Sequence, residues 1–122
     1  NDVYKLVSDL KEKKQEYFVT LTLDGAARLI QKRVVFIGTL NQSLVHPREV
    51  FADAIGDRAA GVICVHNHPS GNIQPSREDI AVTKKLVEAG KIIGIRIMDH
   101  VIIGKTSYFS FQAEGLLNNG EY

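Results

Sequence analysis

An unbroken apolar run at residues 59–65 leads directly into two histidines, His66 and His68. A continuous apolar run of this length is typical of a strand covered on both faces, whereas a half-exposed strand alternates apolar and polar residues. We therefore expect a sheet with other elements packed against each of its sides. The histidines follow at the carboxyl end of this buried strand, so polar chemistry begins where the strand ends.

Other segments have the composition of strands, being rich in β-branched and aromatic residues. They are residues 16–23, 27–40, 92–98, 101–103 and 108–111. The first two are separated by Asp24-Gly25, a turn signal that predicts a hairpin. The third and fourth are separated by Asp99-His100, which we interpret as a strand junction where Asp99 caps a turn.

Three segments carry the spacing of amphipathic helices. Residues 1–14 are expected to form an N-terminal helix or linker, with Asp2 as the cap of the helix. Pro47 suits the first position of a second helix, and Ser76 caps a third that we expect Gly90 to end. The side chains expected to face the core from these two helices are Val50, Phe51, Ala54, Ile55, Ile80, Thr83, Leu86 and Val87. The order α-β-β-α-β-α-β-β-β predicts an α/β fold, close to α+β, with a mixed sheet flanked by helices.

Composition restricts the class of protein. At 122 residues, the chain can bury the core of a single domain without disulfides. Its 15 Lys and Arg residues against 14 Asp and Glu residues give a net charge of +1, which offers no argument for nucleic-acid binding. The single cysteine, Cys64, is expected to be a small buried hydrophobe in a reducing, cytoplasmic protein. No apolar run approaches the about 20 residues that span a membrane, and a start at Asn1 rather than Met indicates a fragment of a longer protein.

The histidine pair and a following carboxylate form a candidate metal site. His66 and His68 lie one residue apart in extended backbone, so both side chains point to the same side and can converge. Asp79 follows near the start of a helix. Two imidazoles and one carboxylate can hold one zinc ion and leave a position for water, which is the arrangement of catalytic rather than structural zinc sites.

A hydrolytic metal site also needs a base that accepts a proton from water. Glu16 is the favoured candidate because it opens a strand inside the expected sheet, where an unpaired carboxylate is costly. Ser76 has two compatible roles, since its hydroxyl can cap the helix and can also stabilise an oxyanion beside the metal. A role of Asp99 and His100 in supporting a ligand histidine is the weaker alternative to a strand junction. Arg28, Lys32 and Arg33 form a basic cluster that we interpret as a solvated strand face.

The pattern His66-x-His68-Pro69, six residues, then Ser76-x-x-Asp79 resembles the JAMM motif of the MPN-plus (JAB-type) zinc metalloproteases. Residues 45–51, 66–71 and 99–104 resemble one bacterial branch, the RadC family, and the likeness runs from about residue 16 to residue 117. The resemblance implies zinc held by His66, His68 and Asp79 with a bound water, Glu16 as general acid and base, and Ser76 as oxyanion stabiliser. It also implies a curved mixed sheet with cytidine-deaminase-like layering.

The function implied by this resemblance is a metallopeptidase or isopeptidase acting on a protein or peptide substrate. The alternative is a metal-binding but catalytically silent interaction module associated with DNA repair or recombination. A nucleobase deaminase is excluded, because Asn67 stands where the deaminase glutamate belongs and only one cysteine is present. RadC-like proteins usually carry an upstream helix-hairpin-helix segment that binds DNA, which this sequence does not contain, and no residue pattern here supports the family's traditional DNA-repair label.

Overall fold

The computed structural model describes residues 2–40 and 45–117 of the chain, which form a mixed five-stranded sheet with helices on both faces. The strands are β1 (Tyr17–Leu23), β2 (Leu29–Ile37), β3 (Gly61–Asn67), β4 (Arg96–Ile103) and β5 (Tyr108–Ser110). Their order across the sheet is β2-β1-β3-β4-β5. Only β3 and β4 pair in parallel, and the other neighbours are antiparallel. The predicted mixed α/β architecture is therefore confirmed.

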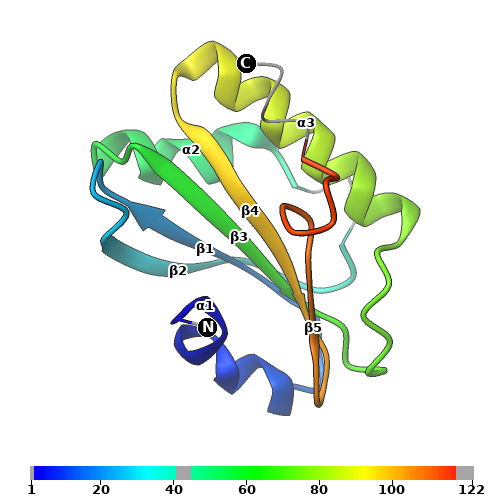
Figure 1. The fold of residues 1–122 in the computed structure, drawn as a ribbon. Helices are drawn as coiled ribbons and strands as arrows, with labels where there is room; N and C mark the ends of the chain where they lie inside the picture. Colours follow the sequence, from blue (N-terminus) through cyan, green and yellow to red (C-terminus); the bar gives the residue numbers. More distant parts are fainter. Residues whose placement is uncertain (1, 41–44, 118–122) are drawn as a thin grey trace.

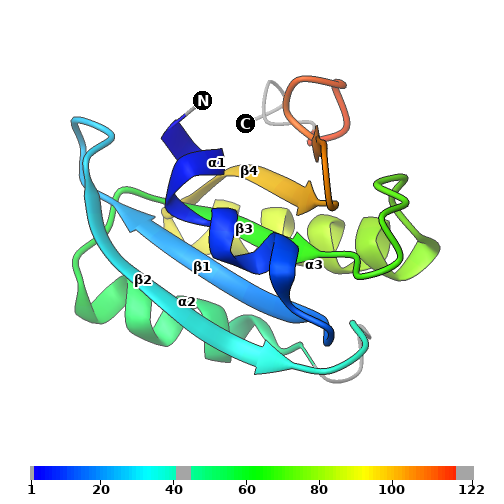
Figure 2. The ribbon, with the colours of Figure 1, turned by 90° about the horizontal axis from the view of Figure 1, so that it is seen from below.

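The helices cover the two faces of the sheet unequally. The helices α2 (Pro47–Gly56) and α3 (Arg77–Ile93) lie on one face. The short helix α1 (Asp2–Leu6) and the 3-10 helix η1 (Ser8–Glu12) cover the other (Figure 1, Figure 2). All seven residues of β3 are buried between these layers, as the apolar run at residues 59–65 predicted.

Alternation along the central strands divides their side chains between two cores. Phe18 and Cys64 pack in the core beneath α2 and α3. Val19 and Val65 pack in the second core, which also holds Leu10 of η1. Because side chains alternate along a strand, the residue after Val65 points back toward α3. His66 thus enters the helix-covered layer of the sheet.

The region around α3 and β4 differs from the sequence prediction. Gly90 does not end α3, since a later glycine, Gly94, adopts the left-handed C-cap conformation with φ 86°. Gly90 is required inside the helix for close packing, because a Cβ there would lie 2.4 Å from the carbonyl oxygen of Ile95. Residues 92–98 and 101–103 were expected to form two strands, but Asp99 and His100 lie inside the single strand β4. A register shift beside Ile63 accommodates the extra residue without breaking β4.

The second strand of the hairpin is shorter than expected, and the N-terminal helix is divided into two. Asp24 and Arg28 close the β1–β2 turn, and Ala27 lies within it at φ 61°, so β2 begins at Leu29 and not at residue 27. The single helix predicted at residues 1–14 divides into α1 and η1, because Val7 leaves helical geometry at φ −122° and ψ 15°. The cap predicted at Asp2 lies outside the described side chains.

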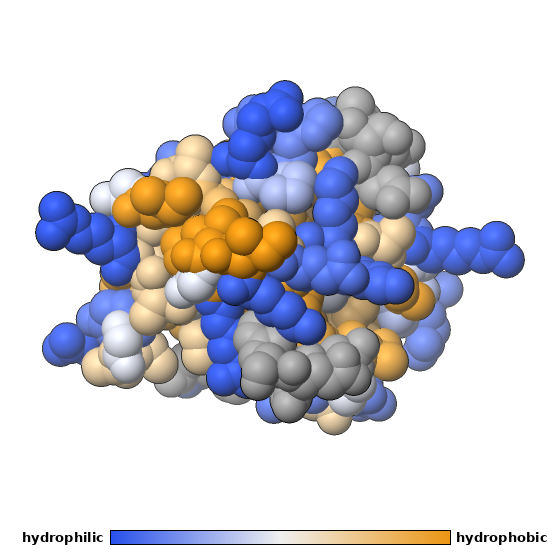
Figure 3. Space-filling view, turned by 90° about the horizontal axis from the view of Figure 1, so that it is seen from above, coloured by the Kyte–Doolittle hydropathy of each residue, from blue (hydrophilic) through white to orange (hydrophobic). Residues whose placement is uncertain are grey.

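Two apolar residues expected in the core lie at the surface instead. Ile55 is 56% exposed and Ile80 is 49% exposed, so the buried stripes of α2 and α3 are narrower than their apolar patterns. Figure 3 shows that apolar side chains gather in a patch on the face seen from above. Within residues 2–40 and 45–117, no helix has the length and apolar character needed to cross a membrane.

The close approach at Gly90 makes a testable prediction. In Gly90→Ala, the new Cβ would clash with the backbone of Ile95, and we expect the free energy of unfolding to fall by about 1–3 kcal/mol. The matched control is Gly56→Ala at the end of α2, where the added Cβ would meet nothing within 4 Å in the described part of the chain beyond its neighbours and the helix's own backbone. Urea denaturation should show the control to be neutral or slightly stabilised, and equal stability of the two variants would contradict the packing argument.

Candidate metal centre

The two histidines converge where β3 leaves the sheet. His66 lies in β3, and the backbone N–H of His68 donates to the carbonyl oxygen of Ile103 at 2.9 Å, which extends the pairing with β4 by one residue. The imidazole centroids are 4.9 Å apart and nearly perpendicular, at 86°. The convergence expected from their i, i+2 spacing is therefore present in the structure.

Asp79 reaches both imidazoles from the first turn of α3. Its Oδ1 lies 3.0 Å from Nδ1 of His66, and its Oδ2 lies 3.1 Å from Nε2 of His68. A capping box sets this position, because Ser76 N–H donates to Asp79 Oδ2 at 2.7 Å while Ser76 Oγ accepts from Asp79 N–H at 3.1 Å. The predicted cap at Ser76 is confirmed, and it also aims the carboxylate at the histidines.

The contacts of Asp79 favour the ionised form of its carboxylate, although the residue is completely buried. Burial alone would raise the pKa of Asp79, but its contacts with His66, His68 and the Ser76 N–H outweigh burial and hold that pKa well below its usual range. The same contact with Asp79 raises the pKa of His68, against the opposing effect of burial. A buried anion of this kind needs positive partners, which protonated imidazoles or a bound cation can supply.

Glu16 approaches the same histidine pair from another part of the chain. Its Oε1 lies 2.8 Å from Nε2 of His66, and its side chain is 23% exposed. The side-chain amide of Asn67 fixes the backbone on both sides of it: Oδ1 accepts from Tyr17 N–H at 2.6 Å, and Nδ2 donates to the Gln15 carbonyl oxygen at 2.9 Å. Asn67 therefore positions Glu16. The sequence offered no local signal for this role, because Asn67 and Tyr17, which share a hydrogen bond, are 50 positions apart in the chain.

The donor atoms fit a divalent cation. Glu16, His66 and His68 each offer a ligand atom within 4.8 Å of the others. The Nδ1 of His68 lies 2.7 Å from the carbonyl oxygen of Asn72 and donates to it, which leaves Nε2 as the ligand atom. His66 Nδ1 and Asp79 Oδ1 are close but not aligned for a hydrogen bond, and neither has another partner in the described part of the chain.

A buried polar atom without a hydrogen-bond partner lowers the stability of the folded state. A bound metal ion would give His66 Nδ1 and Asp79 Oδ1 such a partner. The predicted ligands His66 and His68 lie together with Glu16, and these three residues form the group whose ligand atoms lie within 4.8 Å of one another. The predicted ligand Asp79 contacts both histidines but is not part of that group. The division of roles between the two carboxylates remains a prediction.

Comparison with known proteins identifies the family. Residues 1–116 match the RadC-like JAB domain. The chain belongs to the RadC-like JAB domain family. It is 58% identical over 111 residues to a UPF0758 protein of Methanospirillum hungatei, a match that covers 91% of this chain and 49% of the relative. It is 54% identical over 117 residues to a UPF0758 protein of Methanosarcina mazei, which covers 95% of this chain and 51% of the relative. The chain thus spans about half the length of the curated relatives it matches.

A second hydrogen-bonded layer supports Asp79 in this RadC-like JAB domain. The hydroxyl of Thr83 donates to the backbone carbonyl oxygen of Asp79 at 2.7 Å and accepts a hydrogen bond from Nδ1 of His100. His100 stacks on Phe111, with ring centroids 4.7 Å apart. Burial, and then the charge of His66, lower the pKa of His100 to about 3, so the imidazole stays neutral. His100 thus braces the first turn of α3 and is not part of a strand junction.

Asp99 has a structural role at the sheet edge. Its Oδ1 accepts from the backbone N–H of Gln112 at 3.0 Å, and its Oδ2 accepts from the hydroxyl of Ser110 at 2.6 Å. Asp99 therefore caps the turn after β5, in agreement with the capping interpretation, although it does so from the middle of β4.

The metal-binding prediction can be tested by stability. We expect zinc to raise the melting temperature of the RadC-like JAB domain, because a ligand that binds only the folded state at 100 times its Kd stabilises by about 2.7 kcal/mol. The double variant His66→Ala/His68→Ala should lose this shift and its bound zinc by elemental analysis. His46→Ala is the matched control, because His46 makes no side-chain capping bond at α2. An unchanged zinc shift in the double variant would exclude the site.

The positioning role of Asn67 makes a separate prediction. Asn67→Ala should lower the free energy of unfolding by about 1–3 kcal/mol, because it leaves the Gln15 carbonyl and the Tyr17 N–H without their partner. The exposed Asn72 provides the control, since Asn72→Ala removes only a local side-chain contact with Gln74 N–H. Hydrogen exchange at the Tyr17 amide should accelerate in Asn67→Ala alone, and unchanged exchange would rule out the positioning role.

Proposed function

We propose that this RadC-like JAB domain is a zinc-dependent peptidase or isopeptidase. The observation that carries the proposal is the half-buried carboxylate of Glu16, whose Oε1 is 2.8 Å from Nε2 of His66 beside the completely buried carboxylate of Asp79. Two imidazoles and a carboxylate favour zinc among the common divalent ions. A pocket of about 500 Å³ opens over these groups and is bordered by Glu16, His68, Ser76 and Asp79. It provides space for a substrate amide.

The proposed chemistry assigns one task to each side chain. Zinc held by His66, His68 and Asp79 would polarise the scissile carbonyl and lower the pKa of water. Glu16 would accept a proton from the attacking water and deliver it to the leaving amine, which is the role of a general base and then a general acid. Its backbone is held on both sides by Asn67, so the carboxylate needs little reorganisation during the reaction.

Ser76 can stabilise the oxyanion while it caps α3. Its Oγ accepts a hydrogen bond from Asp79 N–H, which uses a lone pair of the hydroxyl oxygen. The hydroxyl proton remains available as a donor, and Ser76 lies at the border of the pocket. A donor at this place would stabilise the negative charge that develops on the substrate carbonyl oxygen.

The proposed compartment is the cytoplasm. Cys64 is a free, buried cysteine, and burial raises the pKa of its thiol to about 12. Such a thiol is unreactive at neutral pH, so it behaves as a small apolar side chain. This placement supports the interpretation of Cys64 as a core residue, and a lone reduced thiol agrees with a reducing compartment.

The base assignment is tested by Glu16→Gln. We expect hydrolysis of a peptide or isopeptide library to fall by about 10²–10⁴-fold while zinc content stays unchanged. The control is Glu88→Gln, because Glu88 is an exposed residue of α3. Loss of zinc together with activity would make Glu16 a ligand and not the base. If the zinc-loaded wild-type protein cleaves no member of the library, the domain is a silent metal-binding module.

A further inference from the structure

A row of neighbouring pockets leads away from the metal centre. The pocket over the centre shares Glu16, Thr39 and Pro69 with a neighbouring pocket of about 370 Å³. That pocket shares Lys14 and Pro69 with a third pocket of about 490 Å³. Since Pro69 borders all three, the pockets are neighbours on one part of the surface. We call this row of three pockets the Pro69 groove.

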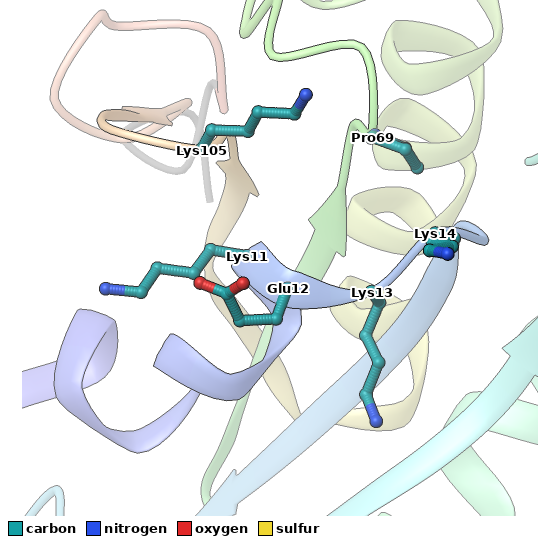
Figure 4. A pocket seen from close by; sticks show the side chains of 6 residues that line it. All are labelled: Lys11, Glu12, Lys13, Lys14, Pro69 and Lys105. Atoms are coloured by element: carbon teal, nitrogen blue, oxygen red, sulfur yellow. The ribbon is translucent and has the colours of Figure 1, made fainter.

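The far end of the Pro69 groove is lined by lysines from two distant segments of the chain. Lys11, Lys13 and Lys14 come from the end of η1 and the residues before β1, and Lys105 comes from the turn after β4 (Figure 4). Their side chains spread along the pocket and do not converge on one point in Figure 4. This spread fits several negative charges along a chain better than one compact anion.

These lysines lack the acidic partners that other basic residues have. On β2 and its turn, Arg28, Lys32 and Arg33 each form an ion pair, so the basic cluster seen in the sequence is neutralised within the molecule. Across residues 2–40 and 45–117, the four groove lysines form no ion pair, and Glu12 is the one acidic side chain among them. The lysine end therefore carries positive charge available to a ligand.

The opposite end of the groove is acidic, with Glu16, Glu78 and Asp79 around the pocket of the metal centre. A ligand that fills the whole groove must place its anionic part on the lysines and keep it away from these carboxylates. A nucleic-acid strand has evenly spaced phosphates, and at this end of the groove they would lie beside Glu16 and Glu78 and not beside lysines. In addition, no phenylalanine, tyrosine or tryptophan side chain on which bases could stack borders the described parts of the groove. A peptide can carry charge in one part only.

We propose that the Pro69 groove selects peptides with an acidic segment on one side of the amide at the metal centre. Aspartate or glutamate side chains of that segment contact Lys14 and Lys105, while a neutral part of the peptide crosses Pro69. The placement of the amide rests on the hydrolytic function proposed above. Binding of the acidic segment does not require hydrolysis, so the two proposals can fail separately.

The test compares two labelled peptides of equal length, one with a block of glutamates and one with glutamines at the same positions. Fluorescence anisotropy with the zinc-loaded protein should show tighter binding of the acidic peptide, with a difference that shrinks as salt is added. In Lys14→Gln/Lys105→Gln, affinity for the acidic peptide should fall about threefold to tenfold, since exposed charge pairs contribute modestly. The control Lys84→Gln/Lys91→Gln changes the net charge equally on α3, outside the groove, and should keep the preference.

Each outcome decides a different point. Equal affinity for the two peptides in the wild-type protein, or a preference retained in Lys14→Gln/Lys105→Gln, would overturn the groove proposal. The groove would be assigned to nucleic acid, and the proposal overturned, if a single-stranded oligonucleotide competed at lower concentration than the acidic peptide. This competition would have to depend on Lys14 and Lys105. If the acidic preference is present but no peptide is cleaved, the groove proposal stands and the hydrolytic function fails.

Discussion

The buried carboxylate of Asp79 is the constraint around which the candidate site is arranged. An ionised group without solvent contact is stable only if hydrogen-bond donors or positive charges surround it. Here the Ser76 N–H, the start of α3 and two imidazoles take that place. These partners come from β3, from the segment after it and from the start of α3. The contacts of this one carboxylate therefore connect three parts of the fold.

The double-covered sheet makes this arrangement possible. The central strand β3 has no solvent-exposed face, so a histidine near its end is already removed from water when it meets Asp79. The parallel pairing of β3 with β4 brings their carboxyl ends to one edge, where His68 continues the hydrogen bonding to Ile103. Neutral His100 and Thr83 then brace α3 from below. The site is thus built at the ends of strands and at the start of α3, and the exposed Ser76 borders its pocket.

The sequence predicted those features that depend on neighbouring residues. The covered strand, the converging histidines and the Ser76 cap follow from local patterns and are present in the structure. Features that depend on distant packing were missed. The clamp between Asn67 and the flanks of Glu16 depends on β1 pairing with β3, and the need for glycine at position 90 depends on the close approach of the Ile95 carbonyl. His100 was misplaced because a register shift inside β4 has no signature in composition.

The side chains of the tripeptide His66-Asn67-His68 make contacts on both sides of the sheet. Alternation sends both imidazoles to the side of α3 and directs the amide of Asn67 to the backbone that enters β1. Inserting or deleting one residue in β3 ahead of this tripeptide would exchange the faces, placing an amide at the metal centre and an imidazole against β1. The length of β3 can therefore change only by an even number of residues, or together with a compensating β-bulge. Otherwise the imidazoles would no longer face α3 and the Asn67 amide would no longer face the backbone before β1.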